Sequence, residues 1–295
     1  MISSDPRELF DPGTLRKFEA AGLLARRMAR GRDRASRRSH ARGASAEFAE
    51  HRPMVQGDDP RLIDWNAFAR WRQLVLRLTV AEEDLHIHFL LDCSRSMAAG
   101  NPPKFDQARR VLAGLAYLAL AGLDRASFCA LGGGRDALAP VRGRDHFHEF
   151  LAVLASCALA EGNPGLEDGV RTWLARKPRR GVAVMVGDFL GNDPGDALRA
   201  FSRLRQAGFE TAALQVLDPA ELECPPRGEY EFEDCESGKV ARVALDAAAA
   251  RAYQTAVDTW RDGLLRDAAA NGGPFMRIGP ADDLAGVLAE AAEWR

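Results

Sequence analysis

The feature that most constrains the fold is an alternation of short apolar runs with helical segments, which begins at residue 85. The strand-like runs are residues 85–91, 126–131, 137–141, 182–186, 209–217, 229–232, 239–244 and 275–278. The helical patterns are residues 104–123, 147–159, 166–175, 197–206, 246–270 and the segment after 281. The run at 182–186 (VAVMV) is uniformly apolar, which is typical of a strand buried on both faces. This alternation predicts an α/β fold with a mostly parallel sheet and helices on both faces.

The residues before 85 differ in composition and predict an N-terminal extension (1–84) on one α/β domain (85–295). An apolar stripe within the first 25 residues predicts a short helix. Residues 26–42 then hold eight arginines and one acid without apolar periodicity, so we expect a basic arm over 26–46. Residues 218–236 show the opposite balance, with eight acids and one arginine. The net charge of −2 averages over these parts, and charge separated in this way can steer a partner.

Several classes of protein are not expected. The longest uncharged apolar run, residues 111–123, is shorter than the ~20 residues that a membrane-spanning helix needs. Five scattered cysteines without a CxxC pair indicate a reducing compartment, so we expect the cytoplasm, either free or at the inner face of the membrane. The basic arm has no aromatic residue on which bases could stack, so we expect no nucleic-acid partner. No P-loop or nucleophile elbow occurs, and we expect neither an enzyme nor a small-molecule substrate.

Hard oxygen ligands follow two of the predicted strands. Asp92, Ser94 and Ser96 come after the run at 85–91, and Asp188 follows the run at 182–186. Ligands of such sheets bind outside the carboxyl ends of the strands, where the strand order reverses. Carboxylate and hydroxyl oxygens suit Mg²⁺, and also Mn²⁺ or Ca²⁺. The alternative is that these Asp and Ser residues cap turns and helices without a metal.

The DxSxS spacing resembles the metal-ion-dependent adhesion site of von Willebrand factor A-like domains. In those domains a Thr from a loop ahead of the second Asp completes the site. Here the corresponding loop, residues 161–165, holds no Thr, and Asn163 is the nearest candidate ligand. Gly187 also departs from the pattern, because a hydroxyl residue is common before the second Asp. Metal binding and metal-free capping therefore both stay open.

Residues 36–97 resemble the bacterial domain of unknown function 58 family. The matching text runs from Ser36 through an Arg-Gly pair to Glu47, and continues with Arg-Pro, GDDPR, IDWN and Ala-Arg. The residues that carry it are Glu47, Arg52, Asp58, Asp59, Arg61, Asp64, Trp65 and Arg70. Residues 217–219 and 232–238 are also similar to that family, whereas Met54 departs from it, because Tyr is usual there.

The resemblance implies a von Willebrand factor A-like fold and association with MoxR-type AAA+ ATPases in the assembly or maturation of protein complexes. We therefore predict a non-enzymatic protein-interaction module whose cation accepts a carboxylate from a partner. One alternative is a metal-independent structural adaptor that binds through the basic arm and the acidic loop. Another is a Mg²⁺-dependent phosphatase, although Ser94 stands where such enzymes place a second Asp. We expect residues 47–84 to brace the α/β domain, with Asp58, Asp59 and Asp64 paired to Arg61, Arg70 or Arg72.

Overall fold

The structure is a computed structural model, and it describes residues 9–31, 48–55, 58–79, 85–132, 137–160, 162, 165–190, 193 and 195–294. The chain forms two compact units. The larger unit comprises Leu85–Arg295 together with the N-terminal residues up to Arg26, and the smaller unit is Arg27–Asp84. Each unit is described by itself.

The larger unit is built on a mixed, mostly parallel sheet, as the alternation of strands and helices predicts. Its six strands are β3 (His86–Asp92), β4 (Arg125–Leu131), β5 (Ala137–Arg142), β6 (Val182–Gly187), β7 (Glu210–Val216) and β10 (Phe275–Ile278). Their order in the sheet is β10-β7-β6-β3-β4-β5. Neighbouring strands are parallel except for β5, which runs antiparallel to β4 as the second strand of a hairpin.

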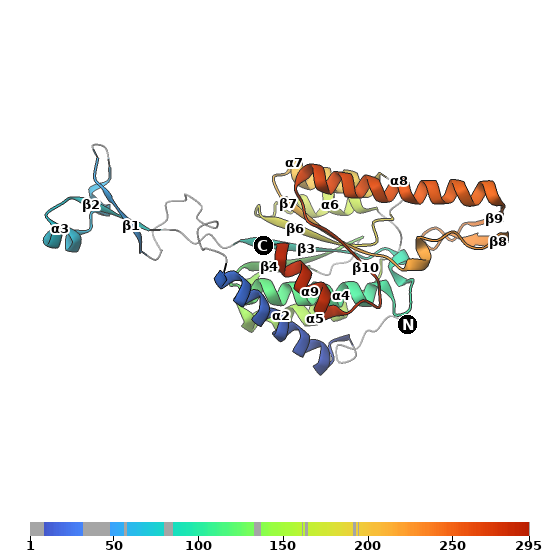
Figure 1. Cartoon of the computed structure of the whole chain (residues 1–295), viewed down its shortest axis with the longest axis horizontal. Helices are drawn as coiled ribbons and strands as arrows, with labels where there is room; N and C mark the ends of the chain where they lie inside the picture. The colour runs from blue at the N-terminus through green and yellow to red at the C-terminus, as the bar shows by residue number, and fades with distance from the viewer. Residues whose placement is uncertain are drawn as a thin grey trace. The chain divides into compact units, whose positions relative to one another are not determined.

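Helices cover both faces of this sheet (Figure 1). One face carries α2 (Pro12–Gly31), α4 (Lys104–Ala121), α5 (Phe147–Ser156) and α9 (Leu284–Ala291). The other carries α6 (Leu166–Leu174), α7 (Asp196–Gln206) and α8 (Ala247–Asn271). Three short 3₁₀ turns, η3 (Arg95–Ala98), η4 (Arg144–His146) and η5 (Pro219–Glu221), lie in the connections, and η6 (Ala292–Trp294) follows α9.

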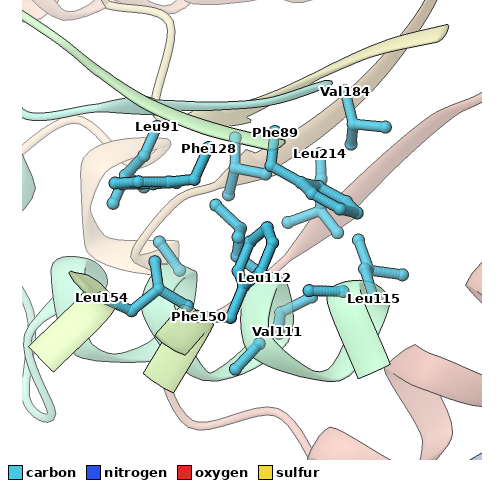
Figure 2. Packing of buried hydrophobic residues seen from close by; sticks show 14 of the residues in the cluster. Phe89, Leu91, Val111, Leu112, Leu115, Phe128, Phe150, Leu154, Val184 and Leu214 are labelled. Carbon is cyan, nitrogen blue, oxygen red and sulfur yellow. The ribbon is translucent and has the colours of Figure 1, made fainter. Parts of the chain in front are cut away.

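The core lies in two layers because β3 is buried on both faces. Phe89 and Leu91 belong to the cluster that includes α4 and α5, and Figure 2 shows them facing Leu112 and Phe150. Leu90, between them, points into the second cluster on the opposite side. Each side chain of this size contributes roughly 1.5–3 kcal/mol when it is fully buried. Packing on both faces therefore holds β3, and with it the strand end, in place.

A two-stranded hairpin follows β7 and carries the acidic segment. Its strands are β8 (Gly228–Glu233) and β9 (Val240–Leu245), which pair antiparallel. Asp234 shapes the connecting turn: its carboxylate accepts the backbone N–H of Glu236 at 3.0 Å and the hydroxyl of Ser237 at 2.5 Å. Gly238 follows with a positive φ of 67°, which this tight turn requires. The turn therefore holds residue 236 in one place.

The smaller unit pairs β1 (Phe48–Pro53) with β2 (Val75–Thr79) and places η2 (Pro60–Leu62) and α3 (Trp65–Trp71) between them. Sequence reasoning missed β1, because residues 48–53 (FAEHRP) show no clear period-2 pattern and contain a proline. The prediction that this segment braces the α/β domain stays a prediction.

The aspartates of the GDDPRxIDW run have local structural roles. Asp59 and Asp64 are the N-caps of η2 and α3, and each accepts backbone N–H groups of the turn it begins. Asp58 forms an ion pair with Arg52 at 2.7 Å, a partner other than the three arginines that we expected. The remaining motif residues, Arg61, Trp65 and Arg70, are exposed, and Glu47 lies outside the described residues.

Candidate functional site

The candidate site lies where the strand order of the sheet reverses. From β3 the chain continues to β4 and β5 on one side, and it then returns to β6 on the other side of β3. The boundary between β3 and β6 is therefore the switch point at which α/β sheets bind ligands. Asp92 is the last residue of β3, and Asp188 directly follows β6. The structure thus brings these two predicted residues to adjacent strand ends.

Asp92 is a buried carboxylate held by the turn that follows it. It is 5% exposed, and its Oδ1 accepts the backbone N–H of Ser94 at 2.9 Å. Burial raises the pKa of Asp92 from its usual 3.8 to about 7, and the nearby charges of Asp188 and Glu236 add to this. No ion pair with a basic group is formed by Asp92 within the described part of the chain. No basic side chain in the described part of the chain therefore neutralises the Asp92 carboxylate.

The two predicted hydroxyls lie side by side in the same turn. Ser94 Oγ and Ser96 Oγ are 3.0 Å apart. Ser94 precedes η3 as its N-cap but makes no side-chain cap hydrogen bond, so its hydroxyl does not cap the start of that helix. Capping without a metal therefore does not account for Ser94, although Asp92 and Asp188 each accept a backbone N–H two residues further on.

Asp188 has a different environment from Asp92. Its Oδ2 accepts from Lys104 Nζ at 2.8 Å, and its Oδ1 accepts the backbone N–H of Leu190 at 3.0 Å; the Asp188 and Lys104 side chains are both fully buried. Burial lowers the pKa of Lys104, but Asp188 and Glu221 outweigh that effect and leave its pKa raised. Lys104 is therefore charged at neutral pH, and it compensates Asp188 but not Asp92.

Gly187 is required by the packing of Asp92. A Cβ built on Gly187 would lie 2.4 Å from Asp92 Cβ and 2.8 Å from Asp92 Oδ2. Glycine therefore allows the carboxylate to lie against the backbone of β6. Any larger residue at position 187 would displace the Asp92 side chain.

A pocket of about 170 Å³ opens in front of these groups. Its polar wall comes from the turn after β3 and from the turn of the β8–β9 hairpin, and consists of Asp92, Ser94, Ser96, Asp234, Cys235 and Glu236. The remaining wall is glycine and leucine, and Asp188 is not part of it. Among the residues that the structure describes, no lysine or arginine lines this pocket. Its charged groups are therefore all acidic.

Glu236 is the residue of this pocket that sequence reasoning did not select. Its Oε1 accepts the backbone N–H of Ser96 at 2.8 Å, although the two residues are 140 positions apart. Its Oε2 is buried and has no hydrogen-bond partner within the described residues. The available signal was only indirect: Glu236 lies in the acidic segment and in the 232–238 stretch that resembles the family.

The donor set fits a hard divalent cation. Two hydroxyls, the buried Asp92 carboxylate and the further acids of the pocket match the ligand preferences of Mg²⁺, Mn²⁺ and Ca²⁺. The described residues contain no group of three His, Cys, Asp or Glu side chains arranged to hold a metal, so the serine hydroxyls would have to contribute. Asn163, the predicted substitute for the missing Thr, lies outside the described residues.

Comparison with known proteins places the chain in a family. The family model described as "Protein of unknown function DUF58" matches residues 50–262. The chain belongs to this family. The DUF58 chain is also 30% identical over 241 residues to uncharacterized proteins of Mycobacterium tuberculosis and Mycobacterium bovis, an overlap that covers 80% of this chain and 75% of each relative.

Two solved bacterial structures show a weak overall likeness to the chain. BatB from Bacteroides thetaiotaomicron is 16% identical with a TM-score of 0.45, covering 71% of the DUF58 chain and 97% of that chain. An aerotolerance-related membrane protein from Bacteroides fragilis is 18% identical with a TM-score of 0.44, covering 71% and 98% respectively. These likenesses are too low to identify a fold family. In the DUF58 chain itself, no helix within the described residues is both long and apolar enough to cross a membrane.

Proposed function

We propose that the DUF58 chain is a non-enzymatic protein-interaction module that binds a divalent cation in the pocket at the end of β3. Asp92, Ser94 and Ser96 hold the cation, and a carboxylate of a partner protein supplies a further ligand. The observation that carries this proposal is the pocket itself. It lies at the switch point of the sheet, joins two adjacent hydroxyls to a buried acid, and has no basic lining residue among those described.

The distribution of charge supports a cation over simple structural use of these residues. A buried carboxylate is costly unless it is paired or coordinates a metal. The chain pairs Asp188 with Lys104 but leaves Asp92 without such a partner in the described structure. The negative charge of Asp92 is therefore not neutralised by a basic side chain in the described structure, and a divalent cation in the pocket would neutralise it. Mg²⁺ keeps part of its coordination shell for outside ligands, so a partner carboxylate has a place to bind.

The partner that we propose is a MoxR-type AAA+ ATPase, with the chain acting as its accessory in the assembly or maturation of protein complexes. This choice rests on the resemblance to the domain of unknown function 58 family, whose members are commonly associated with such ATPases. We place the chain in the cytoplasm, either free or at the inner face of the membrane.

Addition of Mn²⁺ or Mg²⁺ is expected to raise the melting temperature of the full chain, because a ligand that binds only the folded state stabilises it. At a cation concentration about 100 times Kd, the stabilisation is about 2.7 kcal/mol. Differential scanning fluorimetry measures the shift. Asp92→Ala should abolish it, whereas Asp262→Ala, which removes an exposed carboxylate, should keep it. If wild type and Asp92→Ala respond equally, the cation site is wrong.

Affinity capture from the native cell tests the proposed partner. Tagged wild-type chain in Mg²⁺ should retain an AAA+ ATPase, and the Asp92→Ala chain should lose it. The variant is a cleaner comparison than EDTA, because EDTA would also strip Mg²⁺-nucleotide from an ATPase. Equal capture by both chains would instead favour the metal-independent adaptor, and deletion of residues 26–46 would then be the variant that loses the partner.

A further inference from the structure

The β8–β9 hairpin brings a carboxylate to the pocket from outside the DxSxS motif. Asp234 shapes the hairpin turn by accepting the backbone N–H of Glu236, so the position of Glu236 is set by the turn and not by chance contact. Asp234, Cys235 and Glu236 all line the pocket. The hairpin turn therefore forms one wall of the site that the strand ends open into.

The two oxygens of Glu236 have different environments. Oε1 accepts the backbone N–H of Ser96 at 2.8 Å, which fixes the side chain beside the serine hydroxyls. Oε2 is buried and has no hydrogen-bond partner within the described residues. A buried carboxylate oxygen without a hydrogen-bond partner destabilises the folded chain. Because this oxygen lies beside a pocket, its lack of a partner indicates a ligand in the pocket that contacts it.

We infer that Glu236 is itself a ligand of the cation, and that the bound cation ties the β8–β9 hairpin to the carboxyl end of β3. This inference rests on the proposed function. With Asp92 and the two serine hydroxyls, Glu236 brings the donors from the chain to four of the roughly six oxygens that Mg²⁺ takes. Glu236 thereby replaces the Thr ligand that the adhesion-site pattern has and this chain lacks. The remaining coordination positions of the cation are open to water or to a carboxylate of the partner.

The charge balance agrees with this assignment. Lys104 compensates Asp188. Of the three acids that line the pocket, Asp234 is engaged within the hairpin turn, which leaves Asp92 and Glu236 for the cation. Two carboxylates match the charge of one divalent cation, and the number of charged ligands is a main determinant of cation affinity in oxygen sites. Loss of Glu236 should therefore weaken cation binding even though the DxSxS motif is intact.

Titration calorimetry with Mn²⁺ on the full chain tests the inference, with Glu236→Gln as the variant. Gln keeps an oxygen that can accept the Ser96 N–H, but it loses the charge. We expect Mn²⁺ affinity to fall by about tenfold or more. Glu233→Gln is the matched control, since it removes the same charge from an exposed position on the same hairpin. It should leave the affinity within about twofold, because exposed charges are screened by salt.

Hydrogen exchange of residues 228–245 gives a second readout that does not depend on affinity. Saturating Mn²⁺ should slow exchange in the hairpin of the wild-type chain and of Glu233→Gln, and it should not do so in Glu236→Gln. Equal affinities and equal protection in the two glutamine variants, with binding lost in Asp92→Ala, would overturn the role of Glu236 and leave the proposed function standing. Absence of Mn²⁺ binding by the wild-type chain would overturn both.

Discussion

Replacing Lys104 by methionine is expected to lower the free energy of unfolding by about 3–5 kcal/mol, because removal of one partner leaves a buried charge without compensation. The Lys104 side chain is fully buried and its ammonium contacts both Asp188 at 2.8 Å and Glu221 at 2.5 Å. Methionine keeps most of the volume but removes the charge and the donors. Urea denaturation at pH 7, followed by circular dichroism, measures the loss.

Lys17→Met is the matched control for this prediction. Lys17 also contacts a carboxylate at 2.8 Å, that of Asp283, but both side chains are largely exposed. Exposed ion pairs contribute about 0–1 kcal/mol, so this variant should unfold almost as the wild type does. Adding Asp188→Asn to Lys104→Met should recover part of the loss, since the core then no longer holds the uncompensated charge of Asp188. Similar losses from Lys17→Met and Lys104→Met would contradict the role given to the buried pair.

Two central strands of the sheet could be predicted from the sequence because their runs are mostly apolar, with only His86 and His88 interrupting residues 85–91. Residues 85–91 and 182–186 were identified from composition alone, and they form β3 and β6 within one residue at each end. A parallel strand that is buried on both faces is a nearly continuous apolar run, and a short run of this kind is readily recognised in a sequence. By contrast, β1 could not be predicted, since Phe48–Pro53 carries charged residues and a proline and forms a strand only by pairing with β2.

The candidate site was predictable only in part, for the same physical reason. Asp92, Ser94 and Ser96 occupy one short turn after β3, so their proximity follows from local structure. Glu236 reaches Ser96 across 140 residues, and Lys104 reaches Asp188 across 84. Such contacts depend on tertiary packing that spacing in the sequence does not encode. Of the two aspartates that we predicted as ligands, only Asp92 lines the pocket, and a ligand role for Asp188 stays a prediction.

The different environments of these two carboxylates lead to opposite effects on stability. Asp92→Asn is expected to stabilise the cation-free chain at pH 8, by about 2–4 kcal/mol. The pKa of Asp92 is raised from 3.8 to about 7, so the folded wild-type chain holds a proton there more tightly than the unfolded chain does. Wild-type stability therefore falls as pH rises from about 4 to 7, and the neutral Asn avoids this loss. The gain should shrink toward zero as the pH approaches 4.

Urea denaturation in EDTA at pH 4.5, 6 and 8 measures this dependence, and Asp188→Asn is the comparison. That variant should destabilise the chain at pH 8, because it leaves Lys104 buried without the carboxylate 2.8 Å away. With saturating Mn²⁺ the wild-type chain should regain stability at pH 8 and Asp92→Asn should not, since the cation binds the ionised carboxylate. A loss of stability in Asp92→Asn at pH 8 without cation would mean that the Asp92 charge serves the fold. A gain means that the fold tolerates a destabilising carboxylate at this position, as a binding site requires.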